Sequence, residues 1–178
     1  MNAIDQLRYP VGKFKSPLTI DDVNIPAEIK IISDLPLKMR EATVTLNDTQ
    51  LDTPYRPEGW TVRQVVHHLA DSHINSYCRF KLAMSEDNPV IKPYLEAKWA
   101  EFEDARTAPI FHSLNLIDAV HGRWVLFMNS MTNDDYKRTF FHPEHQKSLT
   151  LFQTLSLYAW HSEHHLAHIT ELKKRNNW

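Results

Sequence analysis

Four histidines lie within eight positions of the segment YAWHSEHHLAHITEL, residues 158–172: His161, His164, His165 and His168. Imidazole nitrogen binds zinc, copper, iron and nickel, so such a cluster is a candidate metal site. On an α-helix each residue advances about 100° around the axis, and residues four apart share a face. Two pairs have that spacing, His161 with His165 and His164 with His168.

The apolar face of this segment favours one of the two pairs. Its core-facing residues are Leu151, Leu155, Ala159, Ser162, Leu166 and Ile169. His165 lies on the edge of that stripe, about 60° from its centre, and His161 lies about 40° further on the same side. His164 falls on the far side of the helix, and His168 is intermediate. We therefore expect His161 and His165 to turn toward the interior of a helix bundle, where neighbouring helices hold metal ligands in place.

A pair of histidines needs a third ligand from another part of the chain. Position 162 is serine, so the HExxH motif of zincin proteases is absent. The other candidates are His67, His68, His73, His112, His121, His142 and His145. Periodicity favours His73, which lies inside the apolar stripe of its helix, whereas His68 lies about 120° and His67 about 140° from the stripe centre. A helix in a bundle contacts two neighbouring helices, so His68 can still face the last helix. Helical geometry therefore leaves open which histidine is the third ligand.

Four long helical segments are predicted to carry these residues. They cover residues 22–46, 61–84, 113–131 and 151–173. Pro36 interrupts the first segment, because proline fits poorly in a helix interior. Two helical pieces or one kinked helix both fit, with Asp34 as a candidate N-cap of a second piece. Together the segments predict an all-α four-helix bundle in one domain of residues 1–178.

Local signals mark the ends of several elements. Thr61 with Gln64, and Thr150 with Gln153, have the spacing of capping boxes that begin the second and last long helices. The segment RTFFHPEHQKSLT has a polar centre between two β-prone flanks, which predicts a small hairpin before the last helix. The segment YLEAKWAEF predicts a short crossing helix. Residues 1–20 have no periodicity and are expected to be irregular, wrapping over the surface.

Composition excludes several classes of protein. The 178 residues carry a net charge of −2 with charges of both signs mixed, so nucleic acid is not an expected partner. Cys78 is the only cysteine, which excludes an internal disulfide and thiolate zinc motifs, and we expect it to be packed as a small residue. With three glycines the chain has no Gly-rich phosphate loop. No secretory signal or long apolar stretch occurs, so we expect a cytoplasmic protein with no membrane partner.

The motifs GWTVRQVVHHLADSH and YAWHSEHHLAHITEL, with AVHGRW and FFHPE between them, resemble the DinB-like superfamily. Within it the chain is similar to the YfiT-like branch of metal-dependent hydrolases and bacillithiol S-transferases. The resemblance covers most of the chain and implies an up-down-down-up four-helix bundle with one divalent metal ion held by three histidines. It implies that His68, in the HHLAD motif, joins the HxxxH pair His161 and His165. The histidines left without an assigned role are His67, His73, His164 and His168.

Three neutral imidazoles leave a divalent ion with its full charge and an open position. Such an ion can acidify water or ionise a thiol. Imidazole suits several metals, and zinc or nickel is the expected ion. The resemblance favours a thiol S-transferase in which bacillithiol is the co-substrate that attacks an electrophile, and it implies a homodimer. The alternatives are a metal-dependent hydrolase that uses activated water and a non-catalytic metal-binding stress protein.

Several polar residues have candidate roles beside the metal. Asp71 lies three residues after His68 and is a candidate to orient that imidazole, the alternative being a solvated carboxylate. Arg79 and Arg123 are candidates to bind the carboxylates of an acidic thiol, with surface ion pairs as the alternative. His142 and His145 either lie near the mouth of the site or face water.

Overall fold

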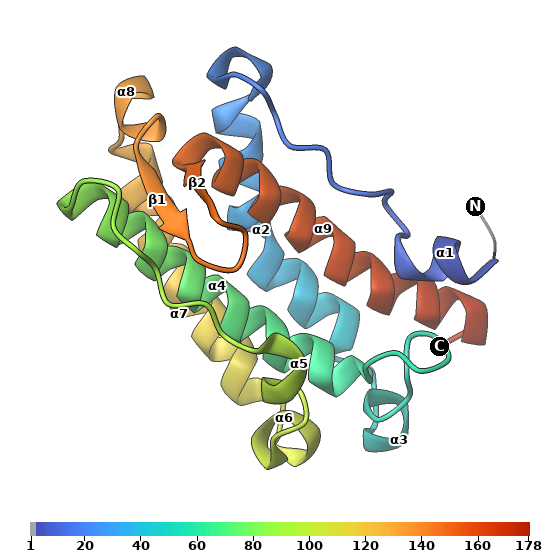
Figure 1. The fold of residues 1–178 in the computed structure, drawn as a ribbon. Helices are drawn as coiled ribbons and strands as arrows, with labels where there is room; N and C mark the ends of the chain where they lie inside the picture. Colours follow the sequence, from blue (N-terminus) through green and yellow to red (C-terminus); the bar gives the residue numbers. More distant parts are fainter. Residues whose placement is uncertain (1–2) are drawn as a thin grey trace.

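The computed structural model describes residues 3–178, and four long helices form its body (Figure 1). The long helices are α2 (Ile25–Thr43), α4 (Val62–Ser85), α7 (Phe111–Asn129) and α9 (Leu151–Asn176). The shorter elements are α1 (Ala3–Arg8), the 3-10 helix η1 (Ile20–Asp22), α3 (Asp48–Leu51), α5 (Glu96–Trp99), α6 (Glu103–Thr107), α8 (Asn133–Tyr136), β1 (Thr139–His142) and β2 (Lys147–Thr150). The predicted four-helix bundle is confirmed.

The bundle has the up-down-down-up order of helix directions. Helix α2 packs against α9 and α7, and α4 packs against α7 and α9. Ser156 near the start of α9 donates to both carboxylate oxygens of Glu28 near the start of α2, at 2.9 and 2.8 Å, so these two helices run parallel. Arg138, which follows α7, donates to the Ala83 carbonyl at the end of α4 at 2.6 Å, so α4 and α7 end at the same end of the bundle. The crossover between that parallel pair, residues 86–110, carries α5 and α6 (Figure 1).

Both predicted capping boxes are present and fix where α4 and α9 begin. The Gln64 amide N–H donates to the Thr61 hydroxyl at 3.1 Å, and the Thr61 amide N–H donates to the Gln64 side chain at 2.9 Å. Thr150 and Gln153 make the same reciprocal pair, both bonds at 3.2 Å. Because the histidine spacings count from these starts, the caps set which face each histidine occupies.

The predicted hairpin is confirmed as an antiparallel pair of strands. Strands β1 and β2 pair from Thr139 opposite Thr150 to His142 opposite Lys147. Strand β2 passes directly into α9, since Thr150 is both the last strand residue and the N-cap of the helix. The hairpin therefore holds the start of the helix that carries the histidine cluster.

Pro36 lies inside one continuous helix, so of the two predicted alternatives the single helix is present, and two helical pieces with Asp34 as an N-cap are not. The Asp34 carboxylate instead pairs with Lys30 at 2.9 Å and Lys38 at 3.7 Å along the exposed face of α2. Proline has no amide hydrogen, so the carbonyl four residues earlier, that of Ile32, loses its helical donor.

The N-terminal segment is less irregular than predicted, because α1 forms within it. His168 in α9 bonds the Arg8 carbonyl at 3.2 Å, and the Trp160 indole donates to the Gly12 carbonyl at 3.1 Å. Residues 9–18 lie alongside α9 without regular structure (Figure 1). Helix α1 is held by contacts with α9, which is distant in the sequence, and helical periodicity cannot reveal such contacts. Residues 1 and 2 lie outside the described residues.

The apolar core consists of two clusters with a polar layer between them. One cluster contains Leu69, Ile117 and Ile169, and the other contains Phe80, Trp124, Leu155 and Tyr158. Between them along the helices lie buried polar side chains: Ser72, His73, Ser76, His121, Ser162 and His165.

The expectation that Cys78 is packed is wrong. It is exposed, because it lies two positions, about 200° of helix rotation, from the buried Phe80. None of the described helices is long and apolar enough to cross a membrane.

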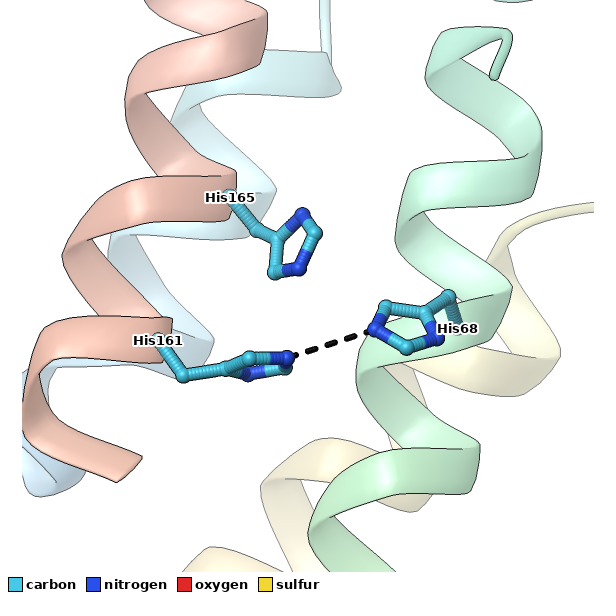
Figure 2. A group of neighbouring side chains, drawn as sticks. All are labelled: His68, His161 and His165. Carbon is cyan, nitrogen blue, oxygen red and sulfur yellow. Dashed lines mark hydrogen bonds between the residues drawn. The ribbon is translucent and has the colours of Figure 1, made fainter. Parts of the chain in front are cut away.

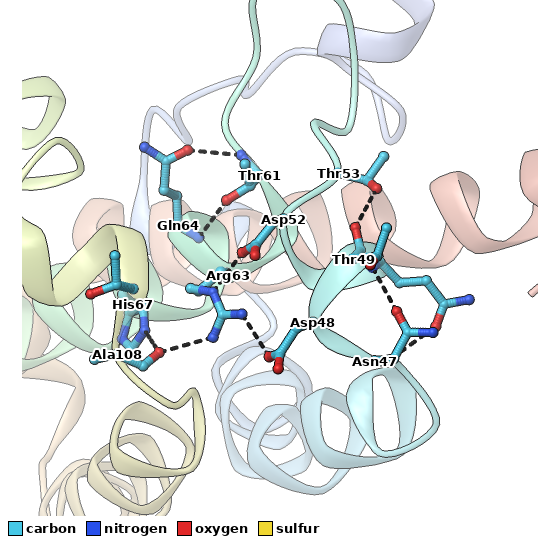
Figure 3. A network of polar contacts seen from close by, with 12 residues as sticks. Asn47, Asp48, Thr49, Asp52, Thr53, Thr61, Arg63, Gln64, His67 and Ala108 are labelled. Carbon is cyan, nitrogen blue, oxygen red and sulfur yellow. Dashed lines mark hydrogen bonds and ion pairs between the residues drawn. The ribbon is translucent and has the colours of Figure 1, made fainter.

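A buried arginine ties two connections to the first turn of α4 (Figure 3). Arg63 donates through Nε to Asp52 at 2.7 Å and through Nη2 to Asp48 at 2.9 Å. Its Nη1 donates to the Ala108 carbonyl, just after α6, at 3.1 Å. The guanidinium therefore joins α3 and the crossover to the helix that carries His68.

We predict that Arg63→Met lowers the free energy of unfolding by about 2 kcal/mol, because charge-assisted hydrogen bonds of a buried group are lost. Urea denaturation followed by circular dichroism measures the loss. The matched control is Arg106→Met, which removes the 2.9 Å ion pair of Arg106 with Glu101 on the surface. Exposed pairs contribute little, so the control is expected to change stability by less than about 0.5 kcal/mol. Equal losses in both variants would contradict the structural role of Arg63.

Candidate metal centre

Three histidines from two antiparallel helices converge in the bundle (Figure 2). His68 extends from α4, and His161 and His165 extend from successive turns of α9. The Nε2 atoms of His68 and His161 are 3.3 Å apart, and one nitrogen from each of the three rings lies within 4.8 Å of the others. The structure therefore brings together the three residues that the family pattern predicts as ligands.

The spacing of these nitrogens fits a metal ion. Zinc binds imidazole nitrogen at about 2.0–2.1 Å, so two nitrogens on one tetrahedral ion lie about 3.3 Å apart. His68 and His161 already have that separation. The His165 ring centroid lies 4.9 Å from that of His68 and 4.4 Å from that of His161, on the same side of both. Three neutral nitrogen donors held by two helices are a set that suits zinc, nickel or copper.

Burial keeps these imidazoles in the form that binds metals. Burial, with a smaller contribution from the neighbouring His164, lowers the pKa of His68 to about 4. Burial, reinforced by the surrounding imidazoles, also holds the pKa of His161 and of His165 well below the usual range. A lowered pKa favours the neutral ring, whose free lone pair can coordinate a cation.

His73 and His121 lie in the polar layer beside the three converging histidines. His73 Nε2 is 3.1 Å from His161 Nδ1, and His73 Nδ1 is 2.8 Å from His121 Nε2. His121 Nδ1 bonds the Ile32 carbonyl at 2.6 Å. Periodicity favoured His73 as a ligand because it correctly placed that ring inside the bundle. In the structure this ring contacts the Nδ1 atom of His161.

The other candidates for the third ligand lie away from the centre. His67 is bonded to the Ser113 hydroxyl at 2.7 Å and to the Ala108 carbonyl at 3.1 Å. His112 is exposed and lies against the Phe111 ring. His142 and His145 stack on each other in the hairpin with ring centroids 4.2 Å apart.

His164 and His168 form a second group with His165, again with nitrogens within 4.8 Å. The helical wheel placed His164 on the far side, yet it is buried, because the N-terminal segment covers that face of α9. His164 stacks on Trp160 at 4.4 Å, and His168 stacks on Tyr55 at 3.8 Å while bonding the Arg8 carbonyl. All three members of this group come from one helix, whereas the first group joins two. The side chains of the first group are therefore held in place by two helices, which makes it the stronger candidate for a metal site.

Two cavities meet at the centre. The first, of about 390 Å³, is lined by all three converging histidines and by aromatic and charged side chains that include Tyr55, Trp60, Trp160, Arg8, Arg56 and Glu58. Trp60 lies 4.7 Å from the His68 ring. The second, of about 620 Å³, is lined by residues that include Arg79, Tyr94, His142, His145 and Tyr158. Both cavities are lined by His161 and Glu96, so His161 forms part of the wall between them.

The predicted polar residues differ in where they lie. The Asp71 carboxylate makes no hydrogen bond to His68 within residues 3–178, and burial raises its pKa to about 6. Arg79 lines the second cavity, and its Nε has no hydrogen-bond partner among the described residues. Arg123 is not brought to the site, since its exposed guanidinium lies 5.7 Å from the Tyr77 ring centroid on another face. Sequence reasoning did not single out Arg8 and Arg56, because only the folded N-terminal segment and loop bring them to the first cavity.

Several known proteins from Bacillus species are similar to this chain. The chain is 48% identical over 172 residues to the "putative metal-dependent hydrolase YfiT" of Bacillus subtilis, covering 97% of each chain. It is 52% identical over 172 residues to a relative of the same description in Bacillus mycoides, covering 97% of this chain and 98% of that one. A Bacillus cereus relative is 50% identical over 175 residues, covering 98% and 100%.

Solved structures agree with the fold. The structure of Bacillus subtilis YfiT, described as having an unusual four-helix bundle topology, matches with a TM-score of 0.94 at 47% identity, covering 97% of this chain and 99% of that one. A mycothiol-dependent maleylpyruvate isomerase matches with a TM-score of 0.65 at 15% identity, covering 86% and 63%, and shares the fold alone. The model of the DinB superfamily matches residues 35–169. With that match and with relatives near half identity over almost its whole length, the chain belongs to the DinB superfamily.

Proposed function

We propose that this protein is a metal-dependent enzyme that activates a low-molecular-weight thiol for transfer to an electrophile. The observation that carries the proposal is the convergence of the buried His68 and His165 with the half-buried His161 at the wall of a cavity. The relatives' shared description as metal-dependent proteins supports the coarser part, a metal-dependent enzyme. A divalent ion held by three neutral imidazoles keeps its charge and an open position, which favours the ionised form of a thiol or of water.

The residues around the ion site are suited to binding rather than to attack. Among the described residues that line the first cavity there is no serine, cysteine or lysine. The lone Cys78 is exposed on another face of α4. In this proposal the nucleophile arrives as a bound molecule, and Trp60 and Trp160 form part of the wall around it.

The charges of the first cavity favour a thiol that carries both signs. Arg8 and Arg56 can bind carboxylates, while Glu58 and Glu96 can accept from an ammonium group. Arg56 already donates to the Tyr55 hydroxyl and the Pro57 carbonyl, which holds its side chain in place. Bacillithiol is the proposed thiol. Bacillithiol, zinc or nickel as the ion, and the homodimer all stay predictions.

A metal-dependent hydrolase is the second candidate, and the shared description of the relatives favours it. The same three histidines would serve it, with water in place of the thiol. In that case Glu96, whose pKa is raised by burial, is a candidate proton acceptor, because its carboxylate is the one among the described residues that lines both cavities.

We predict that the purified protein binds one divalent ion per chain and that His68→Ala weakens its affinity for zinc by more than about 100-fold, because one ligand of three is lost. Competition with a chromophoric chelator measures the Kd. The control is His112→Ala, which removes an exposed histidine and is expected to leave the Kd unchanged. Stoichiometric metal at unchanged affinity in a folded His68→Ala protein would overturn the ligand assignment.

We predict that the metal-loaded protein conjugates bacillithiol to a model electrophile and that His165→Ala lowers the rate by at least about 100-fold. Mass spectrometry of the conjugate measures the reaction. Ester or amide cleavage without conjugation would establish the hydrolase instead. If neither reaction occurs although metal is bound, the protein is a metal-binding bundle without catalysis.

A further inference from the structure

A row of three imidazoles runs from the ion site to the opposite side of the bundle. It joins His161 in α9 to His73 in α4 at 3.1 Å, and His73 to His121 in α7 at 2.8 Å. The row ends where His121 Nδ1 meets the backbone carbonyl of Ile32 in α2 at 2.6 Å. One hydrogen-bonded row therefore links all four long helices.

The carbonyl at the end of the row is available because of Pro36. In an α-helix the Ile32 carbonyl accepts the amide hydrogen of residue 36. Proline has no amide hydrogen, so this carbonyl, inside a continuous helix, lacks its helical donor. His121 supplies the missing donor. The mid-helix proline, which looked like a breaker in the sequence, thus provides a fixed acceptor facing the bundle interior.

A carbonyl can only accept, and this fixes the position of every hydrogen in the row. His121 must carry its hydrogen on Nδ1, so in the neutral ring its Nε2 is an acceptor. His73 must then donate from Nδ1, which leaves its own Nε2 as an acceptor. His161 must in turn donate from Nδ1. The lone pair of His161 is thereby left on Nε2, the atom that faces His68 at 3.3 Å (Figure 2).

We propose that His73 and His121, anchored on the Ile32 carbonyl that Pro36 frees, are positioning residues that hold His161 as its Nδ1–H tautomer with the Nε2 lone pair aimed at the metal ion. This inference rests on the proposed ion site, but the tautomer it requires is a property of the metal-free protein. The row orients one ligand in advance, as outer hydrogen-bond partners do in metal sites generally.

The row also separates the roles of His161 and His68. With the His161 lone pair on Nε2, the 3.3 Å contact requires His68 to donate from its own Nε2 when no ion is bound. An ion that takes both Nε2 atoms must displace that hydrogen, so His68 changes to the Nδ1–H tautomer. His161 is preset, and His68 is the ligand that adapts.

Nitrogen-15 NMR of the folded, metal-free wild-type protein tests the tautomers directly. Long-range proton–nitrogen correlations distinguish a protonated Nδ1 from a protonated Nε2 in each ring. We expect protonated Nδ1 in His121, His73 and His161 and protonated Nε2 in His68. A protonated Nε2 in His161 would overturn the proposal, whether or not the protein proves to bind metal.

Metal affinity tests the positioning role. His73→Phe keeps a ring in the row but removes the acceptor for His161, and we expect it to weaken zinc affinity about 10- to 100-fold. His73→Gln restores an acceptor oxygen toward His161, and we expect it to recover most of that loss. A role of His73 in packing alone predicts the reverse order, with the polar residue binding metal less well than the aromatic one.

Two further variants complete the test. Pro36→Ala returns an amide hydrogen that competes for the Ile32 carbonyl, so we expect a several-fold loss of zinc affinity and a mixture of His161 tautomers in the NMR spectrum. His112→Phe, on the same helix as His121 but exposed, is the matched control and should change neither. If folded His73→Phe binds zinc as tightly as the wild type, the positioning role is refuted. If the wild type binds no metal while the tautomers are as expected, the proposed function fails but the preset His161 stands.

Discussion

Burying a layer of imidazoles across a helix bundle is the constraint on which this structure depends. Each buried polar group that lacks a partner costs about 1–3 kcal/mol, so hydrogen bonds made within the bundle stabilise this layer. Every long helix contributes: α4, α7 and α9 each contribute an imidazole ring, and α2 contributes a backbone carbonyl. Serines take part in the layer, as when the Ser162 hydroxyl donates to the Tyr158 carbonyl at 2.7 Å, whereas Ser76 Oγ and His165 Nδ1 have no hydrogen-bond partner among the described residues. The apolar core is divided in two because this layer occupies the space between the clusters.

The same constraint accounts for a proline in the middle of α2. An interior proline costs a helix about 3 kcal/mol, partly because one carbonyl loses its donor. Here His121 replaces that donor, so the carbonyl is satisfied and the imidazole row has a fixed end. At Pro36 the low helix propensity of proline conflicts with the tertiary structure, which uses the carbonyl that proline frees. Such conflicts are expected at functional sites.

Much of the bundle could be predicted from local signals. The capping boxes at Thr61 and Thr150 involve residues three positions apart, and the hairpin is marked by its turn, so neighbouring sequence suffices for each. The inward pair His161 and His165 followed from helical period. Helix α1 could not be predicted, because its contacts are with α9 more than a hundred residues away. His68 was ambiguous for a related reason. A residue on the edge of an apolar stripe faces the interior only if a neighbouring helix packs against that edge, and the helical period does not show which helix packs there.

The position of His161 explains why this proposed ligand, rather than His68 or His165, has a hydrogen-bonded support. His68 and His165 are buried, and packing restricts their rings; Trp60 lies against His68 at 4.7 Å. His161 lines both cavities and is more exposed than either, so packing holds it least. A ring between two cavities can rotate toward either one unless a directional bond opposes the rotation. The bond from its Nδ1 to His73 acts on the side away from the ion site, so it fixes the ring without obstructing either cavity. In the proposed reaction the thiol and the electrophile meet beside His161, which lines both cavities. As a proposed metal ligand, His161 must keep its orientation while these molecules enter and leave.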